Sequence, residues 1–93
     1  MIAWLKCQTR PGAFDNEVMV GISTTIGRRH IFVDSRLIRA TDEFPPTHEL
    51  MVRVLPSPSF FGAEDQYTRI ALPQRSVEGD MNVSVLASDV SYD

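Results

Sequence analysis

The two halves of the chain share a similar spacing of apolar residues. Residues 1–16 align without a gap with residues 51–66, and residues 18–38 align with residues 70–90 once two extra residues are allowed in the second copy. The identical positions are Leu5/Leu55, Gly12/Gly62, Ala13/Ala63, Asp15/Asp65, Gly27/Gly79 and Val33/Val85. A repeat of this kind indicates two copies of one supersecondary unit, neither of which can bury its apolar face alone. Because the identities are few, chance agreement between two alternating β-sequences is the alternative explanation.

Apolar and polar residues alternate along most of the chain. Val18 and Val20 would share one face of a strand, and Arg53 would point away from Val52 and Val54. A period of two is typical of half-buried antiparallel strands, and the many β-branched residues favour the same structure. We expect six strands, at residues 1–8, 17–25, 29–34, 49–56, 67–73 and 81–87. The alternation predicts a core of Ile2, Trp4, Val18, Val20, Ile31, Val33, Val52, Val54, Ile70, Leu72, Val83 and Val85.

The segments between the expected strands carry turn signals at matching places. Gly27 and Gly79 lie where a hairpin needs a residue that can adopt positive φ. Residues 34–38 predict a single helical turn capped by Asp34 or Ser35, and residues 86–90 could form the same turn in the second copy.

These elements predict one all-β domain of 93 residues. We expect a small six-stranded antiparallel barrel or sandwich built from two similar three-stranded units, 1–38 and 51–90, with a connector at 39–50 and a pseudo-two-fold axis. Helical structure is limited to short turns after the third and sixth strands. Closure would remove exposed strand edges. An open arrangement with strand pairing between chains is the alternative.

Composition bounds the environment and the partners. The net charge of −3 gives the chain as a whole no attraction to nucleic acid. Cys7 is the only cysteine, so an intrachain disulfide is impossible. The sequence has no signal-peptide pattern and no apolar run near the ~18 residues of a membrane span. We therefore expect a cytoplasmic protein without a membrane partner.

Residues with catalytic or ligand chemistry are few. His30 and His48 have no second ligand at metal-binding spacing, and no basic partner for Cys7 is specified. The glycines are scattered and form no phosphate-binding loop. We therefore expect no metal, no cofactor and no catalytic residues, and we favour a protein that is not an enzyme. The remaining enzymatic hypothesis uses Asp15 and Asp65, which the repeat places in equivalent loops.

One group of basic residues stands out. Arg28, Arg29, Arg36 and Arg39 lie with His30 near the first hairpin and the turn after it. The matching positions of the second copy are neutral or acidic, so the charge is polarised between the two copies. Such a bipolar molecule suits self-association or a protein partner, and a basic hairpin could also contact phosphates.

Adjacent phenylalanines mark a second candidate surface. Phe60 and Phe61 cannot both face inward on a regular strand, and prolines precede them. Exposed aromatic residues are typical of interface cores. We therefore expect a protein interaction or assembly module that binds another protein or forms a homodimer, with these phenylalanines and the four arginines as contact residues. The alternative is a small nucleic-acid-associated protein that contacts phosphates through the arginine face.

Overall fold

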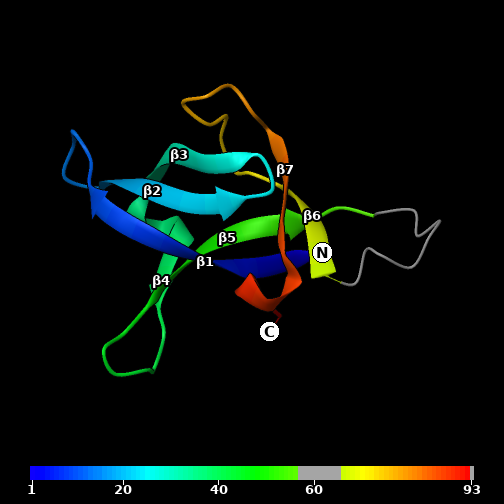
Figure 1. The fold of residues 1–93 in the computed structure, drawn as a ribbon. Helices are drawn as coiled ribbons and strands as arrows, with labels where there is room; N and C mark the ends of the chain where they lie inside the picture. Colours follow the sequence, from blue (N-terminus) through cyan, green and yellow to red (C-terminus); the bar gives the residue numbers. More distant parts are fainter. Residues whose placement is uncertain (57–65, 93) are drawn as a thin grey trace.

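The computed structural model describes residues 1–56 and 66–92 of an all-β protein (Figure 1). The strands are β1 (Ile2–Pro11), β2 (Glu17–Thr24), β3 (Gly27–Asp34), β4 (Ile38–Ala40), β5 (His48–Val54), β6 (Tyr67–Ala71), β7 (Asn82–Leu86) and β8 (Val90–Ser91). Two single 3-10 turns, η1 (Ser35–Leu37) and η3 (Ala87–Asp89), follow β3 and β7. No helix in these two segments has the length and apolarity that a membrane span needs.

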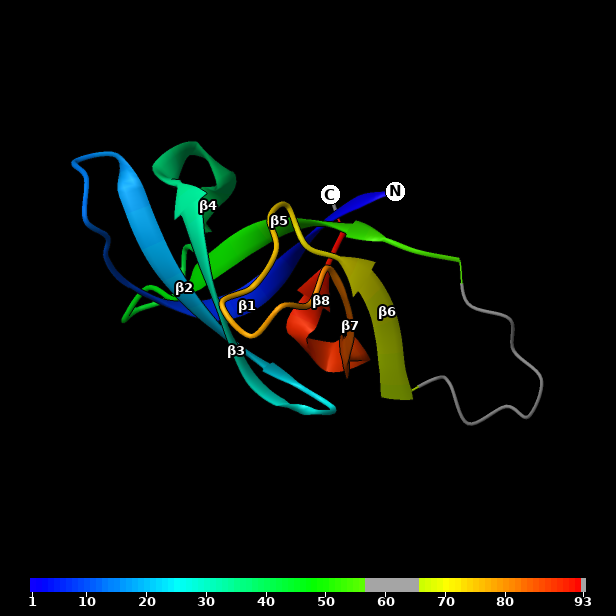
Figure 2. The ribbon, with the colours of Figure 1, turned by 90° about the horizontal axis from the view of Figure 1, so that it is seen from above.

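The strands form one antiparallel sheet that curls into a half-barrel (Figures 1 and 2). The order is β3-β2-β1-β5-β6-β7, with β4 added to β5 and β8 added to β1. Two backbone hydrogen bonds link the ends of the sheet. The N–H of Thr25, in the β2–β3 turn, donates to the carbonyl of Ser84 at 3.0 Å, and the N–H of Val77 donates to the carbonyl of His30 at 2.7 Å. These two hydrogen bonds hold the two ends of the curled sheet together.

The sheet has eight strands in the described residues, whereas the sequence predicted a six-stranded barrel or sandwich. All six expected strands are present, and the additional ones are β4 and β8. Strands of three and two residues are too short to show a readable alternation. Residues 39–50, which were predicted to be a connector, contain the end of β4 and the start of β5.

Local signals in the sequence predicted the turns at Gly27 and Gly79 and the short helical turns after β3 and β7. The backbone has positive φ at Gly27 (106°) and Gly79 (102°), and no other described residue has positive φ. The side chain of Asp34 accepts a hydrogen bond from the backbone N–H of Arg36 at 2.9 Å, so Asp34 caps η1. The second turn, η3, has no such side-chain cap.

The core lies on the inner face of the curled sheet. Its buried apolar members are Ala3, Leu5, Val20, Ile22, Ile31, Val33, Leu50, Val52, Ile70, Leu72, Val83 and Val85. Eight of the twelve predicted core residues are among them. Val18 and Val54 are partly buried and pack against this cluster.

The prediction of which β1 residues face the core was wrong. Ala3 and Leu5 are buried, whereas Ile2 is 54% exposed and Trp4 lies on the outer face. Residues 2–5 are apolar at both parities, so alternation alone does not select a face. The pairing with β5 selects it, because Leu5 lies opposite Leu50. In a sheet with one buried face, a slip of one residue reverses every side chain of the strand.

Candidate functional site

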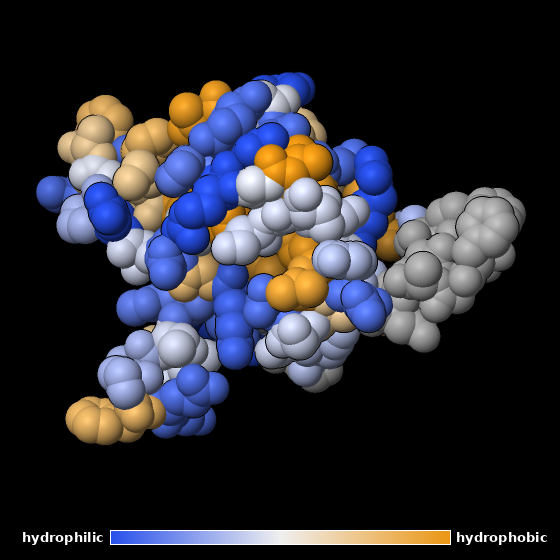
Figure 3. Space-filling model, in the orientation of Figure 1, coloured by the Kyte–Doolittle hydropathy of each residue, from blue (hydrophilic) through white to orange (hydrophobic). Residues whose placement is uncertain are grey.

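The outer face of the sheet is rich in cations. The register that turns the core inward places six basic side chains outward, on Lys6, Arg10, Arg28, Arg39, Arg53 and Arg69. Of these six, only Arg39 forms an ion pair with a carboxylate of the described residues. The strands carry only three carboxylates, on Glu17, Asp34 and Glu49. The outer face is therefore basic although the chain is acidic, and hydrophilic side chains gather over β1–β3 in Figure 3.

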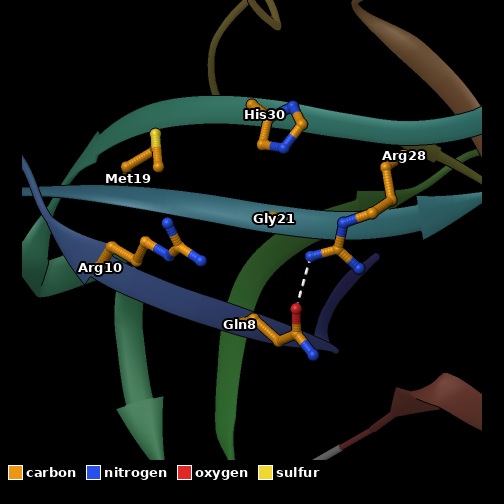
Figure 4. Close-up of a pocket in the computed structure, with 6 residues that line it drawn as sticks. All are labelled: Gln8, Arg10, Met19, Gly21, Arg28 and His30. Carbon is orange, nitrogen blue, oxygen red and sulfur yellow. Dashed lines mark hydrogen bonds between the residues drawn. The ribbon is translucent and has the colours of Figure 1, made fainter.

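A hollow of about 300 Å³ lies on this face, over the first three strands (Figure 4). Its lining comes in pairs from β1, β2 and β3, namely Gln8 and Arg10, Met19 and Gly21, and Arg28 and His30. We call it the basic hollow. Successive outward positions on three adjacent strands create it, so rigid sheet backbone positions every lining residue.

Gly21 forms the floor of the basic hollow. The guanidinium of Arg28 lies directly over it, and a Cβ at residue 21 would sit 2.5 Å from Nη2 of Arg28. From this position Nη2 donates a hydrogen bond to Oε1 of Gln8 at 2.5 Å. A glycine inside a strand often marks a close approach of another group to the backbone. Here the approaching group is the Arg28 side chain, which spans from β3 across β2 to β1.

Arg10 reaches toward the same space from the other end of the hollow (Figure 4). Neither Arg10 nor Arg28 forms an ion pair within residues 1–56 and 66–92. Two like charges that converge in this way repel each other and attract an anion placed between them. Guanidinium groups bind carboxylates and phosphates with good geometry. The basic hollow is thus suited to a carboxylate or a phosphate group.

His30 is held at the rim by a carboxylate from the opposite end of the sheet. Its backbone N–H donates to Oε1 of Glu78, and its Nδ1 lies 2.9 Å from Oε2 of the same residue. The hydrogen bonds from the ring and backbone of His30 lower the pKa of Glu78 to about 2. Glu78 therefore stays ionised and clamps the β6–β7 connection onto β3.

The four predicted arginines have different surroundings. Arg28 lines the basic hollow, and Arg29 faces the other way on the same strand, where its Nε donates to Oδ2 of Asp80 at 2.5 Å. Arg36 is exposed and bonds to Asp34. Arg39 donates from Nε to Oε1 of Glu49 at 2.9 Å.

Arg39 also lies 4.2 Å from the centroid of the Trp4 ring, a cation–π contact. Three of the four arginines are therefore paired with carboxylates. The charge polarisation seen in the sequence is partly neutralised, because Asp80 belongs to the acidic copy and pairs with Arg29. Phe60 and Phe61 lie outside the described residues.

Sequence reasoning missed Gln8 and Arg10. Two signals could have found them. They alternate along β1 with the inward-facing Cys7 and Thr9, and Gln8 lies opposite Gly21, the glycine in the middle of an otherwise well-formed strand. Polar residues at outward positions next to a strand glycine point to a functional surface.

An exposed loop lies between β4 and β5 (Figure 1). We call residues 41–47 the finger. The N–H of Thr41 donates to the carbonyl of Thr47 at 2.8 Å, and their hydroxyl oxygens are 2.9 Å apart. Above this closed base the finger presents Asp42 and Glu43, and Phe44 is 99% exposed. In Figure 3 it projects at the lower left with a hydrophobic tip.

Cys7 is not activated as a nucleophile. Burial, with a further contribution from Glu49, raises its pKa to about 12, so the thiol stays protonated. His48 is its cross-strand neighbour, but the structure records no hydrogen bond between them in the described part of the chain. The described residues also contain no group of three His, Cys, Asp or Glu side chains that could hold a metal ion.

Comparison with known proteins gives no relative: no family model, no curated protein and no solved structure matches this chain.

Proposed function

We propose that this chain is a non-enzymatic interaction and assembly module that binds an acidic segment of a partner protein on the outer face of β1–β3. The observation that carries the proposal is the convergence of Arg10 and Arg28 on the basic hollow without a carboxylate of the described residues to pair with. An acidic side chain of a partner would relieve the repulsion between the two guanidinium groups.

A protein partner fits this surface better than a nucleic acid. Outside the strands, the described residues carry six acidic side chains, Asp15, Asp42, Glu43, Glu78, Asp80 and Asp89, against only Arg36 and Arg75. A continuous phosphate backbone that extended beyond the strands would be repelled by these loop carboxylates. A short acidic segment need not extend that far, and it would also find the apolar side chains of Met19 and, farther along β3, Phe32.

We also propose that the half-barrel is built from an internal repeat. The order of strand pairing in the two halves supports this. Val20 lies opposite Thr9 and Ile31 in the first half, and Ile70 lies opposite Val54 and Val83 in the second. This pairing equates Val20 with Ile70, whereas the sequence alignment equates Val20 with Leu72. It therefore supports a repeat of strand order, with a different alignment from the one read in the sequence. The fourth strand of each half returns to the first strand of the other, since β4 pairs with β5 and β8 pairs with β1. The pseudo-two-fold axis would then pass between Leu5 and Leu50.

Two further parts of the proposal come from the sequence. We place the protein in the cytoplasm, and the free thiol of Cys7 suits that reducing compartment. Self-association through Phe60 and Phe61 is a second mode of assembly.

The binding proposal can be tested with fluorescence anisotropy. The probes are a labelled peptide of alternating Glu and Phe residues and a labelled single-stranded RNA of equal charge, each titrated at low and moderate salt. We expect the peptide to bind, and we expect binding to weaken with salt because two or three exposed cations are involved. Arg10→Glu combined with Arg28→Glu should abolish binding.

The matched control is Arg53→Glu combined with Arg69→Glu. It makes the same charge change on the same face of the sheet, in the other half. The proposal would be contradicted if the peptide still binds when Arg10→Glu and Arg28→Glu are combined. It would also be contradicted if this variant and the control abolish binding equally. Tighter binding of the RNA, with a log–log salt slope of roughly −2 to −3, would favour the phosphate-binding alternative.

A further inference from the structure

We propose that the acidic segment bound by the basic hollow is the finger of a second copy of this chain. This inference rests on the function proposed for the hollow, and it adds the identity of the partner. In such a dimer, Asp42 and Glu43 of one copy pair with Arg10 and Arg28 of the other, and Phe44 stacks on the guanidinium of Arg28.

The tip of the finger makes few contacts with the described part of its own molecule. Phe44 is 99% exposed, the highest value among the exposed large apolar residues of the described chain, so it contacts almost nothing within its own molecule. Asp42 and Glu43 form no ion pair in the described residues. An aromatic side chain that follows two carboxylates and is fully exposed to water is suited to act as an interface anchor.

The base of the finger is already ordered. Thr41 and Thr47 are joined by a backbone hydrogen bond and by a contact between their hydroxyl groups, and the N–H of Thr47 donates to Oγ1 of Thr41 at 3.0 Å. Glu43 is additionally reached by the Thr47 hydroxyl at 3.5 Å. A loop that is preorganised loses less conformational entropy when it binds.

The basic hollow offers the complementary chemistry. Arg10 and Arg28 supply two cations that lack carboxylate partners in the described chain, and the Met19 thioether supplies an adaptable apolar contact. Because Gly21 has no Cβ, the guanidinium of Arg28 lies over the backbone of β2, where an aromatic ring can stack on it. Arginine and an aromatic ring attract each other in this geometry.

Each copy carries one finger and one hollow. Two copies related by a two-fold axis can therefore make two identical contacts, and the second contact is then formed within an existing complex. This reciprocity allows a closed dimer even when a single contact is weak.

Sedimentation velocity of the full chain tests the proposal. The first variant carries Asp42→Lys with Glu43→Lys and the second carries Arg10→Glu with Arg28→Glu. The wild type should form a dimer at low salt, and either variant alone should weaken association by at least about ten-fold. A mixture of the two should associate again, because the reversed finger of one matches the reversed hollow of the other. Phe44→Ser should also weaken the dimer, whereas the control Phe14→Ser, which alters another exposed phenylalanine, should not.

Three outcomes would overturn the inference. They are a wild type that stays monomeric at about 200 µM and low salt, variants that do not rescue each other, and a dimer that is lost only with Phe60→Ser or Phe61→Ser. If the acidic peptide still binds at Arg10 and Arg28 in any of these cases, the function proposed for the hollow stands and only the identity of the partner is wrong. If the peptide also fails to bind, both fail.

Discussion

Arg28 crosses the backbone of Gly21 so closely that no side chain could stand between them, with only 2.5 Å from a Cβ to Nη2. Glycine inside a strand lowers intrinsic strand stability. At this position it allows a guanidinium to lie flat across the sheet and reach Gln8 on the second neighbouring strand.

Gly21→Ala should therefore displace the Arg28 side chain while the fold remains. The clash is with the end of a flexible side chain, so the free energy of unfolding should change by less than about 1 kcal/mol. The Arg28 Nε–H resonance in NMR spectra should shift, and peptide binding at the basic hollow should weaken. Ala71→Gly, on the outer face of the other half, is the control. An unchanged Arg28 resonance would contradict this account.

Leu5→Ala should destabilise the protein by about 2–5 kcal/mol, because Leu5 is 1% exposed and its truncation leaves a cavity. Ile2→Ala should cost less than about 1 kcal/mol, because Ile2 is mostly exposed. Urea unfolding, followed through Trp4 fluorescence, measures both. Equal effects would mean that the first strand does not face as described.

Arg39→Ala should lower the free energy of unfolding by about 1–3 kcal/mol. Glu49 is 5% exposed and would lose its ion pair, although the partial exposure of Arg39 moderates the cost. The emission of Trp4 should shift as well, since the guanidinium no longer covers its ring. Arg36→Ala is the control, and it should leave the unfolding midpoint nearly unchanged because water screens its pair with Asp34.

Acid should release the β6–β7 connection from β3. The pKa of Glu78 is about 2 in the folded protein against an ordinary 4.5, so its stabilising contribution is complete above about pH 4.5 and is lost as the pH falls toward 2. Hydrogen bonds from Arg36 likewise lower the pKa of Asp34. Hydrogen exchange of the His30 amide should accelerate over this range. In Glu78→Gln that acceleration should disappear. If it persists, protonation of Glu78 is not its cause.

Cys7 should react slowly with iodoacetamide at pH 8. Burial raises its pKa to about 12, so almost none of the thiol is ionised. Mass spectrometry should show slow modification of the folded protein and rapid modification in urea. Fast modification of the folded protein would contradict the burial of this thiol.

Most of the longer strands could be predicted because apolar and polar residues alternate along them, and the hairpins because Gly27 and Gly79 mark them. The strands β4 and β8 are too short to show such alternation. The facing of β1 could not be predicted, since Ile2, Ala3, Trp4 and Leu5 offer apolar residues to both faces. The face is decided by long-range pairing with β5 and by the cation–π contact of Trp4, neither of which is local in sequence.

The site was less predictable than the fold. Arg28 and Arg29 are neighbours in sequence, which suggested one basic cluster, but neighbours in a strand point to opposite faces. The true companions of Arg28 come from β1 and β2, and only the register of three strands brings Gln8 and Arg10 beside it. Clusters assembled from several strands require the pairing to be known first.

The pairing of Leu5 with Val90 has a consequence for the order in which the molecule can form. β1 begins at Ile2, and one of its partners is the short strand β8 at Val90–Ser91. Its other partners are β2 and β5, so the pairing of β1 cannot be completed until residues 90 and 91 have left the ribosome. Contacts between such distant residues are typical of slow folding, in milliseconds to seconds. A chain stalled during synthesis would thus expose an incomplete first strand to chaperones.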